Sequence, residues 1–205
     1  MLMWTVEACV NVNKVSKVII STDSEEYWQT VRSFCDSKKL ELDLRTPEQA
    51  GDEVKIFDYL KAEREKLFSQ KEEKFVLALP TVPLRTDRQI DEAIELFEIG
   101  EFPVFSASEY HFPLSFAFAV EGATVKPLLT DSPLVTGNTR SQEQKAFFHP
   151  NGAIYVRSSL DLKNEELKSL YQNAQPYFMD RKTSIDVDNE LDLIIARGLI
   201  RRTTW

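Results

Sequence analysis

The sequence predicts an α/β fold in which a mainly parallel sheet carries helices on both faces. Two runs of apolar and β-branched residues, KVIIST at 17–22 and KFVLALP at 74–80, have the composition of buried strands. Amphipathic segments with helical spacing follow both runs, so strands and helices alternate along this half of the chain. Such alternation is typical of parallel sheets, because each crossover places a helix against the sheet.

The first elements are indicated by apolar spacing and by helix-start signals. LMWTVEACVNV has apolar residues at helical spacing and predicts a helix ahead of the strand at 17–22. Asp23 stands three residues before Glu26, which is the spacing of a capping box, and predicts a helix to about Cys35. The next expected elements are the strand LELDLRT and the helix DEVKIFDYLKAEREKLFSQ.

A second capping-box pair follows the strand at 74–80. Thr86 precedes Gln89 by three residues and predicts the start of the helix DRQIDEAIELFEIG, which Gly100 is expected to end. FPVFSASEY then has the pattern of a strand.

The second half predicts an antiparallel insertion at about 112–145. FPLSFAFAVEGATVKPLL has the pattern of two strands around a turn at Glu121-Gly122. The elements expected after it are the strand NGAIYV, a helix within SSLDLKNEELKSLYQ, the short strand TSIDV and the final helix NELDLIIARGLIRR. We therefore expect one domain over residues 1–205 that carries this insertion.

Charge narrows the classes of partner. The 205 residues include 25 Lys and Arg against 33 Asp and Glu, which gives a net charge of −8. A general nucleic-acid binder needs a basic face to neutralise phosphates, so we expect no nucleic-acid partner. A single nucleotide held by a few local cations and a metal ion remains compatible with this charge.

The remaining composition predicts a cytoplasmic protein. Cys9 and Cys35 lie in apolar segments without CxxC spacing and are expected to be buried free thiols in a reducing compartment. His111 and His149 are too isolated for a histidine-rich zinc site. The sequence has no apolar run long enough to span a membrane and no signal-peptide pattern at its start, so no membrane partner is expected.

Asp186 and Asp188 are the strongest candidates for a metal site. Alternate residues of a strand share a face, so the strand expected at 183–187 would aim both carboxylates at one cation. Mg²⁺ prefers hard oxygen ligands and often shares its site with substrate phosphates. The alternatives are that Asp188 or Asn189 caps the final helix and that Asp186 is a surface residue.

Five segments together resemble a known family. They are IISTDSEE (19–26), LPTVPLRTDRQIDEAIELF (79–97), TRSQ (139–142), HPNGAIYV (149–156) and SIDVDNELD (184–192). In this order they are similar to the acylneuraminate cytidylyltransferases, the CMP-sialic acid synthetases. The resemblance implies a three-layer, Rossmann-like fold of the nucleotide-diphospho-sugar transferase type, with a dimerisation insertion.

The resemblance also implies a reaction and its partners. The expected reaction transfers CMP from CTP to a sialic-acid-like nonulosonic acid, with release of pyrophosphate. Mg²⁺ would be held by Asp186 and Asp188, which the resemblance makes the catalytic residues, and the protein would be a homodimer. The sequence leaves open whether the sugar is of the sialic, legionaminic or pseudaminic type.

Further site residues are carried over from the family's motifs. Arg45 would lie near the nucleotide and Arg85 at the binding edge; Arg45 could equally be a surface cation at a strand end. Arg140 and Gln142 would lie near the sugar, whose carboxylate a guanidinium binds well, with a loop salt bridge as the alternative. Asp23 would face the nucleotide, although its role as a helix cap explains it as well.

Asn151 and Tyr177 complete the set implied by the resemblance. Asn151 would lie beside the sugar, and its alternative is a plain turn with Gly152 before a strand. Tyr177 and Phe178 would wall the sugar pocket, with core packing as the alternative for Phe178.

The sequence departs from the family on the nucleotide side. The family begins with a strand and a phosphate-binding loop rich in Gly, Ser, Lys and Arg, and LMWTVEA resembles the helix after that loop. Leu79 stands where the family often has glutamine. Reduced activity of this form is therefore expected. The alternatives are a non-catalytic homologue that binds sugar or metal and a dimerising scaffold protein of the same fold.

Overall fold

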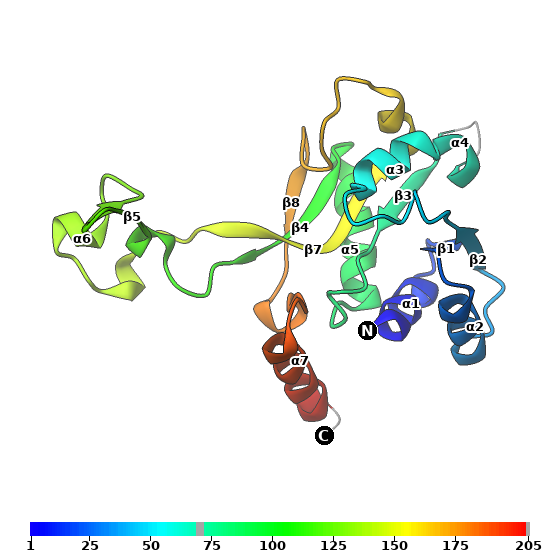
Figure 1. The fold of residues 1–205 in the computed structure, drawn as a ribbon, viewed down its shortest axis with the longest axis horizontal. Coiled ribbons are helices and arrows are strands. Elements are labelled where there is room, and N and C mark those ends of the chain that lie inside the picture. Colours follow the sequence, from blue (N-terminus) through cyan, green and yellow to red (C-terminus); the bar gives the residue numbers. More distant parts are fainter. Residues whose placement is uncertain (69–71, 204–205) are drawn as a thin grey trace.

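The computed structural model describes residues 1–68 and 72–203. Figure 1 shows a core of helices and strands from which a long arm projects, with the last helix on the side of the core. None of the helices in the described ranges has the length and apolar character that a bilayer-spanning helix needs.

The first half contains alternating helices and strands, as the sequence predicts. Its elements are α1 (Leu2–Asn11), β1 (Val18–Thr22), α2 (Glu25–Phe34), β2 (Leu40–Leu44), α3 (Ile56–Ala62), α4 (Arg64–Leu67), β3 (Lys74–Leu77), α5 (Asp87–Gly100) and β4 (Val104–Glu109). The capping box of α5 is present, because the Thr86 side chain accepts from the Gln89 amide and the Gln89 side chain accepts from the Thr86 amide.

The second half contains the arm, two further strands of the core and the last helix. Its α-helices and strands are β5 (Phe118–Glu121), β6 (Thr124–Pro127), α6 (Pro133–Thr136), β7 (Phe148–Ser158), β8 (Gln175–Phe178) and α7 (Glu190–Thr203). Four short 3-10 helices lie between them: η1 (Leu114–Phe116), η2 (Ser141–Glu143), η3 (Ser159–Lys163) and η4 (Arg181–Thr183). The expected hairpin is β5 and β6, and Gly122 in its turn has a φ of 62°.

The strands form three separate sheets. The strand orders are β1-β2, β3-β7-β4-β8 and β5-β6. The pairs β1/β2 and β4/β8 are parallel, whereas β7 runs antiparallel to both β3 and β4. The α/β fold class predicted from the sequence is confirmed, with sheets that are mixed because β7 returns from the arm in the opposite direction.

The main core lies where α5 and α1 cover the four-stranded sheet. Its fully buried residues lie on α5, at the start of β4, in β7 and in the loop after β3; they are Ile90, Ala93, Val104, Ala153, Ile154, Val156 and Val82. A second cluster packs α3 and α4 against the opposite side of β7 and around the loop after η3. Each face of the central strand β7 is therefore buried, which explains why its residues read as a continuous apolar run.

Two helix boundaries differ from the prediction. Ser24, not Asp23, is the N-cap of α2, and its hydroxyl accepts from the Tyr27 amide at 3.3 Å. Asp23 is exposed. At the end of α5, Gly100 is still helical, and the left-handed residue that ends the helix is Glu101 with a φ of 54°.

Three expected elements were wrong in type or extent. The helix expected within SSLDLKNEELKSLYQ is only the 3-10 helix η3 followed by turns, because Leu167 and Leu170 turn inward to pack beside Tyr155. The single helix expected before residue 70 is divided into α3 and α4, and its last residues fall partly outside the described ones. The strand TSIDV is absent from the described structure, since Asp180 caps η4 there by accepting from the Lys182 amide at 2.7 Å.

The cysteines are free thiols, as predicted, but they are half-buried and not fully enclosed. Cys9 lies on α1 and Cys35 follows α2. Burial raises the pKa of the Cys9 thiol above its ordinary value, against a smaller opposing effect of Arg85. Cys9 is therefore a thiol and not a thiolate at neutral pH.

Candidate functional site

An irregularity in the pairing of β4 with β7 forms the centre of the site. Phe105 pairs with Tyr155 but Ala107 pairs with Pro150, so β7 contains extra residues between these points. Gly152 lies in this bulge with a φ of 72°, a conformation that side chains with a Cβ atom rarely adopt. Bulges of this kind redirect side chains next to active sites.

Asn151 holds the bulge in place through hydrogen bonds to three segments. Its Oδ1 accepts from the Ser106 hydroxyl at 2.5 Å and from the Ala153 amide at 3.1 Å. Its Nδ2 donates to the Ser184 hydroxyl at 2.9 Å and contacts the Met179 sulfur at 3.6 Å. The side chain is 3% exposed. With its amide occupied in this way, Asn151 acts by fixing the backbone of Gly152 and the segment around Ser184.

The segment that carries Asp186 and Asp188 lies beside the bulge. The Val187 amide donates to the Thr81 carbonyl at 2.8 Å, which joins this segment to the loop after β3. A Cβ atom on Gly152 would lie 3.9 Å from Asp186 Oδ2 and 3.4 Å from Leu79 Cδ1. Both are ordinary contact distances, so glycine is favoured here by its positive φ, and the Asp186 carboxylate lies close to the bulge.

Both carboxylates are exposed, and the helix cap is provided by other residues. Asn189 Oδ1 accepts from the Asp192 amide at 3.1 Å, and Asp192 Oδ2 accepts from the amides of Asp188 and Asn189. Of the two capping candidates considered from the sequence, Asn189 is the cap. The side chain of Asp188 is therefore not needed to start α7.

Arg85 is a buried cation next to Asp186. Its side chain is 3% exposed, and its Nη2 donates to the Leu79 carbonyl. Burial lowers the pKa of Arg85 to about 10, an effect opposed by Cys9 and Asp186, so the guanidinium stays charged at neutral pH. Within the described part of the chain, its Nε and Nη1 atoms have no hydrogen-bond partner.

The donor set at this place fits a hard divalent cation that also has ligands from a substrate. In residues 1–68 and 72–203 no group of three or more His, Cys, Asp or Glu side chains gathers to hold a metal. Asp186 and Asp188 could supply two carboxylates. Mg²⁺ commonly binds one or two carboxylates and completes its octahedron with water and phosphate oxygens.

We call Asp186, Asp188, Arg85 and the Gly152 bulge the cluster. Arg45 lies apart from it, at the ends of β1 and β2. Its guanidinium carbon is 5.4 Å from the centroid of the Tyr59 ring, and its Nη2 lies 3.5 Å from the Ser21 carbonyl oxygen. Next to it, buried Asp43 accepts from the Ser21 and Tyr59 hydroxyls at 2.6 Å each and lies 2.5 Å from Lys66 Nζ. Arg45 is thus positioned by a buried polar network at the strand ends.

Asp43 gives this network a pH dependence. Burial alone would raise the pKa of the Asp43 carboxyl, but hydrogen bonds from Lys66, Ser21 and Tyr59 outweigh it and hold the pKa below its ordinary value. A depressed pKa in the folded state contributes stability above the unfolded pKa, and this stability is lost as pH falls through the folded pKa. We expect Asp43→Asn to lower the free energy of unfolding at pH 7 by about 1–3 kcal/mol.

Comparing Asp43→Asn with the wild type at acidic pH tests whether the charge of the Asp43 carboxylate causes the difference in stability. The stability difference between the two proteins should shrink as pH falls below about 4, where the wild-type carboxyl takes up its proton. Urea unfolding at several pH values measures it, with Asp58→Asn on the exposed face of α3 as the control. A difference that stays constant down to the acid limit would contradict the assignment.

Arg140 and Gln142 lie on the arm, and the structure of one chain does not bring them to the cluster. The arm runs between β4 and β7 and projects from the core (Figure 1). Arg140 is exposed and pairs with Glu143 at 3.0 Å. The loop salt bridge considered as the alternative for Arg140 is therefore present.

Tyr177 and Phe178 face opposite sides of β8, and the core packing considered for Phe178 is found at Tyr177 instead. Tyr177 lies over the core, and its hydroxyl donates to Glu92 Oε2 at 2.5 Å. Burial, and secondly the Glu92 carboxylate, raise the pKa of Tyr177. Phe178 points outward and packs on Phe148, with ring centroids 4.6 Å apart. Alternation along β8 explains these positions, since neighbouring residues of a strand face opposite sides.

Ser184, Ser106 and Thr81 are site residues that the sequence did not single out. The Ser106 hydroxyl bonds to Asn151 and to the Ile154 amide, the Ser184 hydroxyl to Asn151, and the Thr81 carbonyl to the Val187 amide. Together these bonds join β4, β7, the loop after β3 and the segment before α7. Ser184 falls inside the SIDVDNELD motif, which was the available signal. Three of the five motifs, at 79–97, 149–156 and 184–192, meet at this cluster.

Comparison with known proteins agrees with this convergence. No protein-family model matches the chain. The N-acylneuraminate cytidylyltransferase of Streptococcus agalactiae serotype V is 28% identical over 205 residues, which covers 97% of this chain. That of Escherichia coli O18:K1:H7 is 27% identical over 202 residues, which covers 96% of this chain. The chain is a homologue of the N-acylneuraminate cytidylyltransferases.

This cytidylyltransferase homologue spans less than half the length of those relatives, 46% of the streptococcal protein and 45% of the E. coli protein. The family resemblance inferred from the five motifs is confirmed by the identity along nearly the whole chain. Because so much of each relative lies outside the alignment, their activity is considered below as a proposal.

Solved structures of nucleotidyltransferases share the fold. A 4-diphosphocytidyl-2C-methyl-D-erythritol synthase from Anaerococcus prevotii superposes with a TM-score of 0.67 at 10% identity, covering 98% of this chain and 85% of the other. A CMP:2-keto-3-deoxy-manno-octonic acid synthetase complexed with CTP gives a TM-score of 0.61 at 14% identity, covering 98% and 88%. The expected Rossmann-like nucleotidyltransferase fold of this homologue is confirmed.

Proposed function

We propose that this chain transfers CMP from CTP to a sialic-acid-like nonulosonic acid and releases pyrophosphate. In this reaction the anomeric hydroxyl oxygen of the sugar forms a bond to the α-phosphorus of CTP. The bond from that phosphorus to the bridging oxygen breaks, pyrophosphate leaves, and the hydroxyl proton passes to solvent. The observation that carries the proposal is the meeting of Asp186, Arg85 and the Gly152 bulge in a homologue of the N-acylneuraminate cytidylyltransferases.

The side chains at the cluster match the charges of such a reaction. Asp186 and Asp188 would hold Mg²⁺ together with phosphate oxygens, and the ion would neutralise charge on the transferring phosphate. Arg85 has two nitrogen atoms, Nε and Nη1, without a hydrogen-bond partner among the described residues, and a positive charge that interacts with Asp186. Positioning of this kind, together with electrostatic stabilisation, supplies most of the catalysis in phosphoryl transfer.

The proposal predicts pyrophosphate release that requires CTP, a nonulosonic acid and Mg²⁺ together. A coupled phosphate assay with N-acetylneuraminic acid measures it, with legionaminic and pseudaminic acids as alternative acceptors. Replacing CTP by ATP is the control for nucleotide choice. Release that continues without the sugar would indicate a CTP hydrolase and would contradict the proposal.

A second subunit fits the position of the arm. Seven apolar side chains of the arm are 49–70% exposed: Phe112, Phe118, Val120, Val125, Leu128, Leu134 and Val135. A lone hairpin is only marginally stable, so β5 and β6 need a surface to pack on. We propose that the arm packs on a second copy, which would bring Arg140 and Gln142 of one subunit towards the sugar side of the other.

Charged residues introduced on the arm should therefore weaken the dimer. The double substitution Phe118→Asp and Val120→Asp buries two carboxylates at the proposed interface, and we expect it to weaken dimerisation at least 10-fold, because unpaired buried charge is costly. Light scattering over a range of protein concentrations measures the change. Ile99→Asp, at a residue of α5 that is 84% exposed, is the matched control. A wild-type protein that is monomeric at all concentrations would contradict the dimer.

A dimerising scaffold protein is the second candidate, and the exposed apolar arm favours it. A scaffold needs the arm but not the cluster. Calorimetry with CTP, N-acetylneuraminic acid and Mg²⁺ separates the two functions. Heat of binding from any of the three supports a ligand site, and its absence for all three supports the scaffold. A non-catalytic homologue would bind sugar or metal without pyrophosphate release.

A further inference from the structure

The segment at 184–188, which carries Asp186, depends on single bonds to other parts of the chain for its place. In the described structure these residues belong to no helix or strand, so no ladder of backbone bonds fixes them. Asn151 and Thr81 each form one bond with the segment. A further bond comes from α5 and reaches Thr183, the residue directly before the segment.

The bond from α5 is donated by Gln89, which uses both ends of its carboxamide. Its Oε1 accepts from the Thr86 amide at 3.0 Å and belongs to the capping box of α5. Its Nε2 donates to the Thr183 hydroxyl at 2.8 Å. Buried Arg85 directly precedes Thr86. One side chain therefore connects the backbone beside the Arg85 guanidinium with the backbone beside the Asp186 segment.

A second contact from α5 supports this connection. Glu92 lies three residues after Gln89, and residues at this spacing are neighbours on a helix surface. Its Oε2 accepts from the Tyr177 hydroxyl at 2.5 Å. Tyr177 lies on β8, before η4, and Thr183 is the last residue of η4. Helix α5 thus binds the chain on both sides of the turn that leads into the segment at 184–188.

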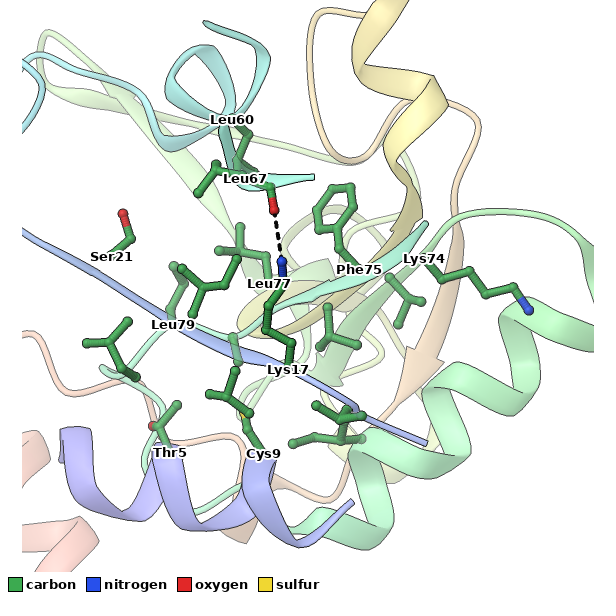
Figure 2. A pocket seen from close by; sticks show the side chains of 18 of the residues that line it. Thr5, Cys9, Lys17, Ser21, Leu60, Leu67, Lys74, Phe75, Leu77 and Leu79 are labelled. Carbon is green, nitrogen blue, oxygen red and sulfur yellow. Dashed lines mark hydrogen bonds between the residues drawn. The ribbon is translucent and has the colours of Figure 1, made fainter. Parts of the chain in front are cut away.

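The apolar side of α5 is anchored in the main core, where Ile90, Ile94 and Phe97 are buried. Ile90 and Ile94 also line a cavity whose wall includes Leu79 (Figure 2), and the Leu79 carbonyl accepts from Arg85. Because packing fixes this side of α5 against the sheet, Gln89 provides a rigid anchor for whatever it binds.

We propose that Gln89 is a positioning residue that sets the place of the Asp186 carboxylate relative to the Arg85 guanidinium. It acts through Thr183 and the backbone that follows Thr183. Loss of this bond leaves the segment held at fewer points, so the carboxylate samples a wider range of positions. This role rests on the proposed function, in which Asp186 holds Mg²⁺.

Thr183→Val tests the bond without disturbing the helix cap. Valine keeps the branched shape of threonine but lacks the hydroxyl, while Gln89 still caps α5. We expect the Val187 amide, which donates to Thr81, to exchange its hydrogen about 3-fold or more faster in the variant. The Gln89 amide, which donates to the Thr86 hydroxyl, should exchange at the wild-type rate. An unchanged rate at Val187, or equal acceleration of both amides by general destabilisation, would overturn the proposal.

Metal binding tests whether the bond positions Asp186. Calorimetry with Mg²⁺ and CTP should show about 10-fold weaker binding to Thr183→Val, the lower end of the effect of removing groups that orient metal ligands. Thr183→Ser keeps the hydroxyl and should restore the wild-type affinity. Thr183→Val also loses a hydroxyl bond to the Asp180 carbonyl at 3.0 Å. Thr30→Val is the matched control, because it loses a similar bond to the Glu26 carbonyl at 2.9 Å on α2. Wild-type affinity in Thr183→Val contradicts the positioning role.

A double-variant cycle shows whether Gln89 and Thr183 act through one bond. Gln89→Met should weaken Mg²⁺ binding about as much as Thr183→Val, and the double variant should bind no more weakly than the weaker single variant. Losses of affinity that multiply would show independent effects and sink the proposal. Amide exchange needs neither metal nor turnover, so it decides the role of Gln89 in holding the segment even in a protein without cytidylyl transfer. Failure of the positioning role is therefore distinguishable from failure of the proposed function.

Discussion

Replacing Asp186 by alanine is expected to lower Mg²⁺-dependent pyrophosphate release by about 10²-fold or more, the scale of losing a main electrostatic element of a site. The carboxylate is exposed beside the Gly152 bulge and next to Arg85. If the proposed function holds, the metal would lose one of its two protein ligands, so Mg²⁺·CTP should also bind more weakly. Turnover under saturating CTP and calorimetry with Mg²⁺ and CTP measure the two effects separately.

Asp188→Ala should give a loss of turnover of the same order. It should leave the fold intact, because Asn189 and Asp192 start α7 without the Asp188 side chain. Asp131→Ala on the exposed arm is the matched control for losing an aspartate. Thermal unfolding should differ little among the three proteins. Undiminished turnover in either Asp186→Ala or Asp188→Ala would refute the metal role of that residue.

Asn151→Ala should be among the most destabilising substitutions near the site. It leaves the buried Ser106 hydroxyl without its acceptor and frees the Ala153 amide, while Ser184 loses a donor. Each unsatisfied buried group costs about 1–3 kcal/mol, so we expect the free energy of unfolding to fall by about 2–4 kcal/mol. Urea unfolding monitored by tryptophan fluorescence measures it.

Ser184→Ala separates the positioning role from stability. It removes the bond that the Ser184 hydroxyl accepts from Asn151 and the bond that it donates to the Asp180 carbonyl at 2.8 Å, and should cost about 1–2 kcal/mol. If the bond with Asn151 positions Asp186, the substitution raises the Mg²⁺ concentration needed for half-maximal turnover. A change in stability alone, with an unchanged Mg²⁺ requirement, would contradict the positioning role.

The sequence predicted those parts of the fold that depend on neighbouring residues. The capping box of α5 needs only Thr86 and Gln89, three positions apart, and both of its bonds form. Asp23 was predicted as the cap of α2 and this was wrong, because the neighbouring Ser24 is an equally good cap and takes the place. The arm's hairpin was also local, with its turn at Gly122.

Long-range contacts explain what the sequence did not predict. The helix expected around residue 167 is lost because Leu167 and Leu170 pack into the cluster of Tyr155, which lies far along the sheet. The antiparallel direction of β7 follows from its return out of the arm, which no local pattern encodes.

At the site, the motifs predicted which segments would meet but not how. Asp186 lies near enough to Arg85 to affect the pKa of its guanidinium. The bonds of Asn151 to Ser106 and Ser184 join three segments that are far apart in the sequence, and such a network has no signal in spacing. Arg140 lies on the arm, so its position relative to Asp186 and Arg85 depends on the surface on which the arm packs.

The strand β7 belongs to the arm's base and to the core at the same time. Its beginning pairs with the end of β4 at Glu109 and Phe148, and its last residues pair with β3. The bulge with Gly152 lies between these two stretches. One strand backbone therefore connects the base of the arm with the place where the Asp186 carboxylate approaches β7.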